Sequence, residues 1–364
     1  MNFMPEDLSK LFSIKPYSLP KEEKNKILFA RLLELTKFHR EHCKEYRNFL
    51  QMKNFDENKI SAPEEIPFFP VRLFKEYELL SVNRAEVFKV MTSSGTTRQK
   101  VSKIFLDKET AMLQQQIMLR LLGDFWGPQR LPMLVIDSPK VIKDRNLFSA
   151  RGAAIIGLSF AARETVYALN EDMTLNLEKI NYFCEKYADK RSIIFGFTFM
   201  VWQHLYRALL QKNLTLNLPE AFLMTGGGWK KLISEAVTRQ IFKQKLREVC
   251  GIRHFLDHYA MVEQTGCLYA ECEEGHLHAS IYSDIFIRDY KDFSLKKHGE
   301  QGIIQVVSML PQSYPGHSLL TEDEGIILGE DDCPCGRKGK YFEILGRLKS
   351  AELRGCSDTY ATGF

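Results

Sequence analysis

From about residue 90 onward, strand-like segments alternate with glycine-containing turns and amphipathic helices, and this alternation limits the possible fold more than any other feature. The apolar runs VFKVM (87–91) and LPMLVID (131–137) have the length and composition of strands. The segment 107–125 begins with Asp107, a residue suited to cap a helix, and continues with apolar residues at helical spacing. RSIIFGF (191–197) and PEAFLMTGGG (219–228) are further strand-then-glycine units. Strand–loop–helix alternation on this scale predicts an α/β fold.

The regions on either side of this core have different patterns. Residues 21–52 have an apolar stripe at three- and four-residue spacing and are expected to form one helix, which a proline-rich extended connector follows. Residues 279–328 contain strand patterns separated by turn residues, which predict a smaller β-rich subdomain. We therefore expect a helical N-terminal segment (1–88), an α/β core (89–278), a β-rich subdomain (279–345) and a short C-terminal tail (346–364).

Charge and hydropathy exclude several classes of protein. The net charge of +4 on 364 residues is too small and too evenly spread to predict nucleic-acid binding. The most apolar stretch, 153–162, is far shorter than the roughly 20 residues of a membrane span. No apolar secretory segment is visible near the N-terminus, so the eight cysteines are expected to be reduced thiols in a cytoplasmic protein.

A loop rich in hydroxyl groups follows the first strand-like segment. TSSGTT (92–97) precedes Arg98 and Lys100, and backbone N–H groups, hydroxyls and a lysine can together surround a phosphate. The GxxxxGK[ST] spacing of a Walker loop is absent. Taken alone, the loop is better explained as a polar surface turn.

Three later segments add to this observation. FLMTGGGWKK (222–231) is a glycine-rich turn, FLDHYAMVEQTG (255–266) places a tyrosine four residues before a glutamate, and YFEILGRLKSAELRGCSD (341–358) contains a Gly-Arg turn. In this order the motifs resemble those of acyl-adenylate-forming enzymes, and the segments IPFFPVRLFKEYELLS and CPCGRKGKYFEILGR resemble the acyl-protein synthetases of the LuxE type, which are related to phenylacetate–CoA ligases. The resemblance implies an adenylate-forming-enzyme-like large α/β domain with a β-rich subdomain, and a C-terminal domain reduced to a short tail.

The resemblance also implies roles for individual residues. Tyr259 would stack on adenine, Glu263 would hold Mg²⁺, Asp323 would bind the ribose hydroxyls and Arg347 would be the hinge arginine that reaches the nucleotide. The phosphate loop would consist of Ser93, Ser94, Gly95, Thr96, Thr97 and Lys100, and the adenine loop of Gly226, Gly227 and Gly228.

The expected reaction is the ATP-dependent activation of a carboxylic acid, most simply a fatty acid, to an acyl-adenylate. Only 17 residues follow Arg347, and Cys356 among them matches the cysteine on which LuxE-type relatives are acylated. The acyl group would then pass to a partner protein such as an acyl reductase. Two alternatives stay open: an aryl- or acyl–CoA ligase, and a nucleotide-binding protein without turnover. The second is suggested by Arg98, Gln99 and Val262, which depart from the motifs.

Cysteine and histidine residues near the β-rich part suggest a metal site. Cys272 and His278 lie about 60 residues before the C-x-C pair Cys333 and Cys335, and together they provide four ligands for a structural Zn²⁺. The alternative is that they are reduced residues on neighbouring β loops. The segment FGFTFMVWQHL (195–205) is either the lining of an acyl pocket or part of the hydrophobic core.

Overall fold

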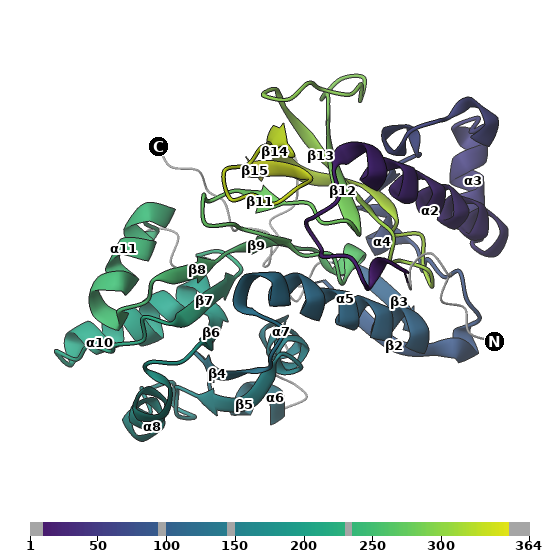
Figure 1. Ribbon diagram of the computed structural model, residues 1–364. Helices are drawn as coiled ribbons and strands as arrows, with labels where there is room; N and C mark the ends of the chain where they lie inside the picture. The colour runs from purple at the N-terminus through teal and green to yellow at the C-terminus, as the bar shows by residue number, and fades with distance from the viewer. Residues whose placement is uncertain (1–9, 94–99, 144–149, 230–234, 349–364) are drawn as a thin grey trace. The chain divides into compact units, whose positions relative to one another are not determined.

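The computed structural model describes residues 10–93, 100–143, 150–229 and 235–348 (Figure 1). These residues form two compact units. The first contains 10–93, 100–125 and 259–348, and the second contains 126–143, 150–229 and 235–258. The predicted α/β class is confirmed. The division differs from the four consecutive segments expected from the sequence, because the N-terminal helices and the β-rich part belong to one unit.

The first unit is built on a mostly antiparallel six-stranded sheet. Its strand order is β11-β15-β14-β13-β12, and β1 pairs with β14 in parallel. Strand β13 is buried at every position after Gln301, and therefore on both faces, whereas β14 alternates buried and more exposed residues along most of its length. The strands are β1 (Phe69–Pro70), β11 (Leu277–His278), β12 (Ser283–Arg288), β13 (Gln301–Ser308), β14 (Ser318–Glu330) and β15 (Lys340–Arg347).

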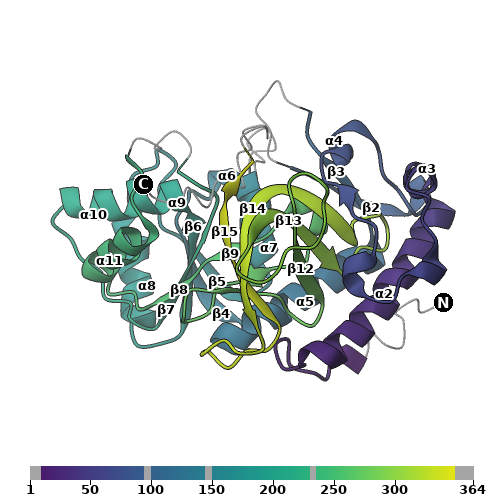
Figure 2. The ribbon, with the colours of Figure 1, turned by 90° about the horizontal axis from the view of Figure 1, so that it is seen from above.

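Two helices rather than one precede this sheet. The prediction of a single helix over 21–52 is wrong at Cys43, whose extended backbone (φ −120°, ψ 111°) separates α2 (Lys21–His42) from α3 (Lys44–Met52). The break turns α3 so that Tyr46 and Phe49 pack against Phe69 of β1, with ring centroids 5.8 and 5.0 Å away. Figures 1 and 2 show α2 lying beside β12 and β13.

A β-ribbon and a long helix complete the first unit. The antiparallel strands β2 (Val87–Thr92) and β3 (Lys103–Asp107) flank the hydroxyl-rich loop. Helix α5 (Lys108–Trp126) follows, and the Asp107 cap is confirmed because the Thr110 N–H donates to Asp107 Oδ1 at 2.8 Å. The short elements are η1 (Glu57–Lys59), η2 (Pro63–Glu65), α4 (Leu73–Glu76), η3 (Arg84–Glu86), β9 (His258–Tyr259), η7 (Val262–Gln264) and β10 (Tyr269–Ala270).

The second unit has a parallel five-stranded sheet in the order β5-β4-β6-β7-β8. The chain runs from β4 to its neighbour β5 at one edge, and then returns past β4 to β6, β7 and β8. Because parallel crossovers are right-handed, this change of direction places α7 on one face of the sheet and α8, α10 and α11 on the other, as Figure 2 shows. Its strands are β4 (Leu131–Val135), β5 (Ala162–Tyr167), β6 (Ser192–Phe197), β7 (Ala221–Gly226) and β8 (His254–Leu256). Its helices are α6 (Lys140–Lys143), α7 (Ala150–Ser159), α8 (Leu177–Tyr187), α9 (Thr198–Met200), the π-helix η5 (Val201–Arg207), α10 (Ala208–Gln211) and α11 (Arg239–Cys250).

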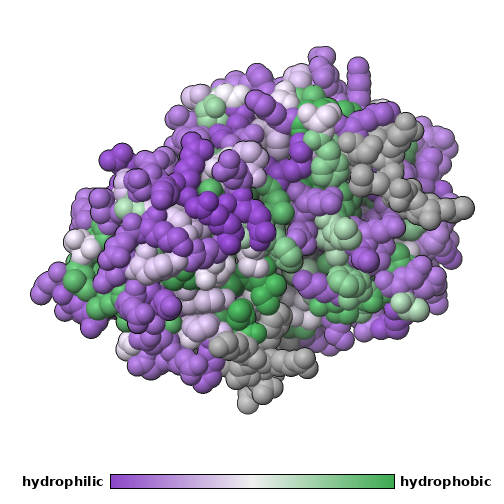
Figure 3. All heavy atoms as spheres, turned by 60° about the horizontal axis from the view of Figure 1, so that its bottom comes forward, coloured by the Kyte–Doolittle hydropathy of each residue, from purple (hydrophilic) through white to green (hydrophobic). Residues whose placement is uncertain are grey.

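Hydrophilic side chains predominate on the face of the molecule that Figure 3 shows. On the face drawn in Figure 3, apolar side chains form separate patches among hydrophilic ones. In the part of the chain that the structure describes, no helix has the length and apolar character needed to cross a membrane.

Candidate functional site

The glycine triplet lies at the carboxyl end of the parallel sheet in the second unit. Strand β7 ends at Gly226, and Gly227 has a φ of +67°, in the left-handed region that favours glycine. Ligands of open parallel sheets bind at this edge, where the backbone turns from strand to loop. The geometry is therefore suited to the nucleotide loop expected from the sequence.

Asp257 stands beside this loop and was missed in the sequence. It follows β8, and its Oδ1 accepts a hydrogen bond of 2.6 Å from the Thr225 hydroxyl on β7. Its Oδ2 lies 3.0 Å from Nε of Arg239 at the start of α11. Both carboxylate oxygens are therefore fixed at the edge that carries the glycine triplet. Its position directly after a strand is the feature by which Asp257 could have been identified from the sequence.

Three residues predicted for nucleotide binding meet in the first unit. Asp323 of β14 and Arg347 of β15 are directly opposite each other in the antiparallel pair, with Arg347 Nε 3.5 Å from Asp323 Oδ1. The Tyr259 hydroxyl donates to Asp323 Oδ2 at 2.6 Å. Arg347 also bonds Glu322 Oε2 at 2.9 Å. The cluster joins a phenol, a carboxylate and a guanidinium from three strands.

Burial controls the electrostatics of this cluster. Tyr259 and Asp323 are only 4% and 6% exposed. Burial, and then the negative charge of Asp323, raise the pKa of the Tyr259 hydroxyl well above its ordinary value. Tyr259 therefore keeps its proton and donates a hydrogen bond to the carboxylate. Its ring packs near Tyr269 and Phe342, with centroids 6.0 and 6.4 Å away.

Glu263, the predicted Mg²⁺ ligand, is buried on the short turn η7. The turn lies so close to Gly316 that a Cβ there would be 2.7 Å from the Glu263 carbonyl oxygen, so only glycine fits. The neighbouring Thr265 hydroxyl is 3.9 Å from the Met91 sulfur on β2, the strand that leads to the hydroxyl-rich loop. The fold thus brings the glutamate turn against the base of that loop.

Of the hydroxyl-rich loop, the structure describes Thr92 and Ser93, and the chain is described again from Lys100; Ser94, Gly95, Thr96 and Thr97 lie outside the described residues, as does Cys356. Ser93 and Ser102 bond each other twice: Ser93 N–H donates to the Ser102 carbonyl at 3.1 Å and Ser102 N–H donates to Ser93 Oγ at 2.9 Å. Lys100 makes an exposed ion pair of 3.0 Å with Glu76 of α4. Such a pair contributes at most about 1 kcal/mol, so an incoming phosphate can compete for the lysine.

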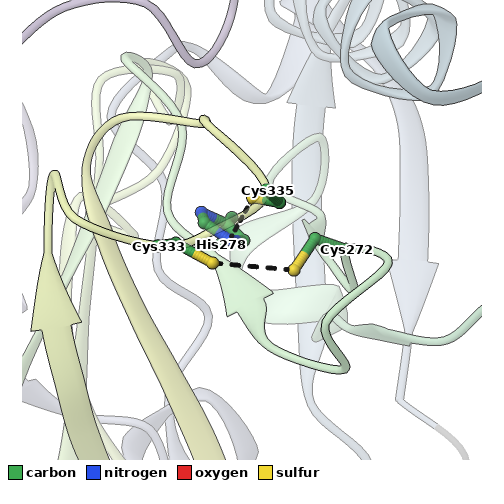
Figure 4. Close-up of side chains that lie close together, drawn as sticks. All are labelled: Cys272, His278, Cys333 and Cys335. Atoms are coloured by element: carbon green, nitrogen blue, oxygen red, sulfur yellow. Dashed lines mark hydrogen bonds between the residues drawn. The ribbon is translucent and has the colours of Figure 1, made fainter.

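The four predicted zinc ligands come together in the first unit (Figure 4). His278 lies on β11, which pairs with β15, and this register places it beside the loop that carries Cys333 and Cys335. Their ligand atoms, with that of Cys272, all lie within 4.8 Å of one another. Three of the four side chains are buried, and Cys335 is partly exposed at a cavity of about 470 Å³ that Arg337 also lines.

The distances fit a tetrahedral zinc centre. Sulfur atoms bound to one tetrahedral Zn²⁺ at about 2.3 Å are separated by roughly 3.8 Å. The Cys272 and Cys333 sulfurs are 3.9 Å apart, and Cys335 Sγ is 3.4 Å from His278 Nε2. Burial first, and then the charge of Arg337, lower the pKa of His278 to about 4, so its imidazole is in the neutral form that binds metals. His276, with Nδ1 3.3 Å from Cys333 Sγ, stacks on Tyr341.

The segment 195–205 forms part of the core of the second unit. Phe195, Met200, Val201 and Leu205 are buried. A half-buried member, His204, has Nδ1 3.1 Å from the Met173 carbonyl oxygen, and burial lowers the pKa of its imidazole. The packing supports the core interpretation of this segment, and its role as the lining of an acyl pocket stays a prediction.

Comparison with solved structures defines the class of fold. An open conformation of 2-hydroxyisobutyryl-CoA ligase, in complex with 2-HIB-AMP and CoA, superposes with a TM-score of 0.72 at 16% identity, over 93% of this chain and 73% of that one. The same ligase in its thioesterification state gives a TM-score of 0.71 at 16% identity, over 92% and 70%. The chain therefore has the fold of this CoA ligase.

Within this class, the chain belongs to the LuxE family of acyl-protein synthetases, whose family model matches residues 5–364. It is 25% identical over 351 residues to the long-chain-fatty-acid–luciferin-component ligase of Vibrio harveyi, over 94% of this chain and 89% of that protein. It is 24% identical over 356 residues to the protein of the same name from Aliivibrio fischeri, over 95% and 91%. The predicted resemblance is confirmed, and the chain is a ligase of the acyl-protein synthetase type.

Proposed function

We propose that the chain activates a fatty acid with ATP to an acyl-adenylate, moves the acyl group to Cys356 and delivers it to a partner protein such as an acyl reductase. The single observation that carries the first step is the buried cluster of Tyr259, Asp323 and Arg347, which joins three motif residues in a member of the LuxE family. The names of the relatives, which ligate a long-chain fatty acid, support the substrate class.

The activation step joins two anions. One carboxylate oxygen bonds to the α-phosphorus, the bond to the bridging oxygen of the β-phosphate breaks, and pyrophosphate leaves. Lys100 and the loop that starts at Ser93 would hold the phosphates, and Glu263 would bind Mg²⁺, which neutralises phosphate charge when present. Loss of one such fixed partner typically lowers the rate by about 10²–10³-fold.

The transfer step uses Cys356, which lies outside the described residues. Its thiolate would bond to the acyl carbon, and AMP would leave as the mixed anhydride breaks, which gives a thioester on the protein. The matching position of this cysteine in the family motif supports its choice over the buried thiols of Cys43, Cys250 and Cys267.

We further propose that Cys272, His278, Cys333 and Cys335 bind a structural Zn²⁺. The distances described above, the neutral imidazole and the soft thiolate donors support this metal. With four protein ligands the ion has no open position, so it would stabilise the first unit and take no part in the reaction.

Intact mass spectrometry tests the reaction directly. The protein is incubated with ATP, Mg²⁺ and a series of saturated fatty acids, and compared with Cys356→Ser and with Cys184→Ser as the matched control. We expect an acyl increment that neutral hydroxylamine removes, that Cys356→Ser abolishes and that Cys184→Ser retains. An increment that persists in Cys356→Ser and that neutral hydroxylamine still removes would show that another cysteine is acylated.

Two measurements separate the alternatives. The likeness of the fold to CoA ligases favours acyl–CoA formation as the second candidate, and it would appear as product formation that requires added coenzyme A. A nucleotide-binding protein without turnover would show no exchange of pyrophosphate into ATP with any acid. We expect exchange that depends on a fatty acid and does not require coenzyme A.

A further inference from the structure

The turn after β6 holds the backbone of the glycine loop. Strands β6 and β7 are parallel neighbours with Phe197 opposite Gly226, so their carboxyl ends lie side by side. The hydroxyl of Thr198, the first residue of α9, donates a hydrogen bond of 2.7 Å to the Gly227 carbonyl oxygen. This side chain therefore fixes the orientation of the peptide that follows the left-handed Gly227.

An aromatic contact from the same helical segment supports the end of the glycine loop. Trp202 lies four residues after Thr198, on the same side of the helix. Its ring centroid is 5.3 Å from that of Trp229, the residue after the triplet, at an interplanar angle of 75°. Phe242 of α11 packs on both rings, at 5.9 and 6.0 Å. One segment thus contacts the loop at its middle and at its end.

Close packing at Gly196 brings this segment directly against the sheet. A Cβ at Gly196 would lie 2.9 Å from the Cβ of Ile136, the residue after β4, and 2.9 Å from the Val201 Cγ2, so the start of the helix packs directly on the end of β6. The helix then continues as the π-helix η5, a geometry that occurs frequently at functional sites. Thr198 therefore lies at the start of a helical segment that packs closely on the sheet and contacts the loop.

We propose that Thr198 is a positioning residue for the nucleotide, which acts by fixing the Gly226–Gly228 loop. This inference rests on the proposed function, since it takes that loop as the nucleotide loop. Without the hydroxyl, the Gly227 carbonyl loses its partner and the peptide gains other orientations. Loss of the contact should therefore weaken ATP binding and leave fatty-acid binding unchanged.

The test compares Thr198→Val, which removes the donor at nearly constant volume, with Thr198→Ser, which keeps it. Isothermal titration with ATP and Mg²⁺ gives the dissociation constant without turnover. Acid-dependent pyrophosphate exchange then gives the KM values for ATP and for the acid. For the valine variant we expect roughly 3- to 10-fold weaker ATP binding and an equal rise in the KM for ATP, the effect of losing one neutral hydrogen bond. The serine variant should match the wild type.

Thr174→Val is the matched control, because the Thr174 hydroxyl bonds Asp172 on the surface of the same unit. Thermal unfolding checks that each variant is folded. Wild-type ATP affinity in Thr198→Val, or an equal rise in both KM values, would overturn the proposal. Wild-type protein that binds ATP without exchange would contradict the proposed function instead, and the titrations would still decide the role of Thr198.

Discussion

Asp323 shows how one residue combines stability with a predicted role in binding. Its two oxygens receive the Tyr259 hydroxyl and the Arg347 guanidinium, so the buried charge is compensated. We expect Tyr259→Phe to cost about 1–3 kcal/mol of stability, because it removes a hydrogen bond to a buried anion. It should also weaken ATP binding, since Asp323 loses its fixed orientation.

Thermal unfolding and the KM for ATP measure the two effects. Tyr282→Phe is the matched control, because its buried hydroxyl donates to the Leu11 carbonyl in the same unit, at 3.1 Å, and touches none of the predicted nucleotide residues. The control should lose a comparable amount of stability and keep its KM. An unchanged KM in Tyr259→Phe would separate Tyr259 from nucleotide binding.

At the scale of the element, the features that depend on residues adjacent in the sequence could be predicted, whereas those that depend on long-range contacts could not. Asp107 could be identified as a cap because the cap and the helix are adjacent in the sequence. The break at Cys43 could not, since no proline or glycine marks it and its cause is the packing of α3 on Phe69. The four candidate ligands were found through cysteine spacing, whereas the bond from Thr198 to Gly227 depends on the neighbouring strands β6 and β7, which the sequence does not order.

The contact between α2 and the β-rich part should make the stability of the protein depend on pH. His39 of α2 stacks on His317 with centroids 4.9 Å apart, and both are fully buried. Burial lowers the pKa of His317 to about 3, with Arg31 as the second cause, and lowers the pKa of His39 well below its ordinary value. Nε2 of His317 lies 2.9 Å from Thr36 Oγ1 and 3.2 Å from the Tyr46 hydroxyl.

The unfolded chain therefore binds protons below about pH 6.5 that the folded chain does not. The stabilising contribution of neutral His317 is complete above that pH and is lost as the pH falls towards 3. At pH 5 this histidine should lower the free energy of unfolding by about 2 kcal/mol relative to its value above pH 6.5. His317→Gln should reduce the pH dependence of the free energy of unfolding, measured by denaturant unfolding between pH 7 and 5. Substitution of the exposed His42 by Gln should not reduce it. Parallel curves for all three proteins would refute the assignment.

At the scale of the whole molecule, the two units contain separate reporters. All three tryptophans belong to the second unit: Trp202 and Trp229 lie within it, and Trp126, the last residue of α5, is its first residue and packs its ring on Phe222. The four candidate zinc ligands lie in the first unit. The ligand loop also anchors the N-terminal segment, because Lys338 N–H donates to the Tyr17 carbonyl at 2.8 Å and the Lys21 N–H donates to Asp331 Oδ2 at 2.8 Å. Metal removal should therefore loosen the first unit selectively.

Chelation of the purified protein tests this expectation. We expect one zinc per chain, whose removal shifts part of the unfolding transition followed by circular dichroism to lower temperature, while the tryptophan fluorescence transition stays in place. The reason is that bound metal stabilises only the fold that assembles its ligands. Cys333→Ser should reproduce the effect without a chelator, and Cys184→Ser should not. If fluorescence and circular dichroism shift together, the two units unfold as one, and the metal stabilises the entire chain rather than the sheet that holds Asp323 and Arg347.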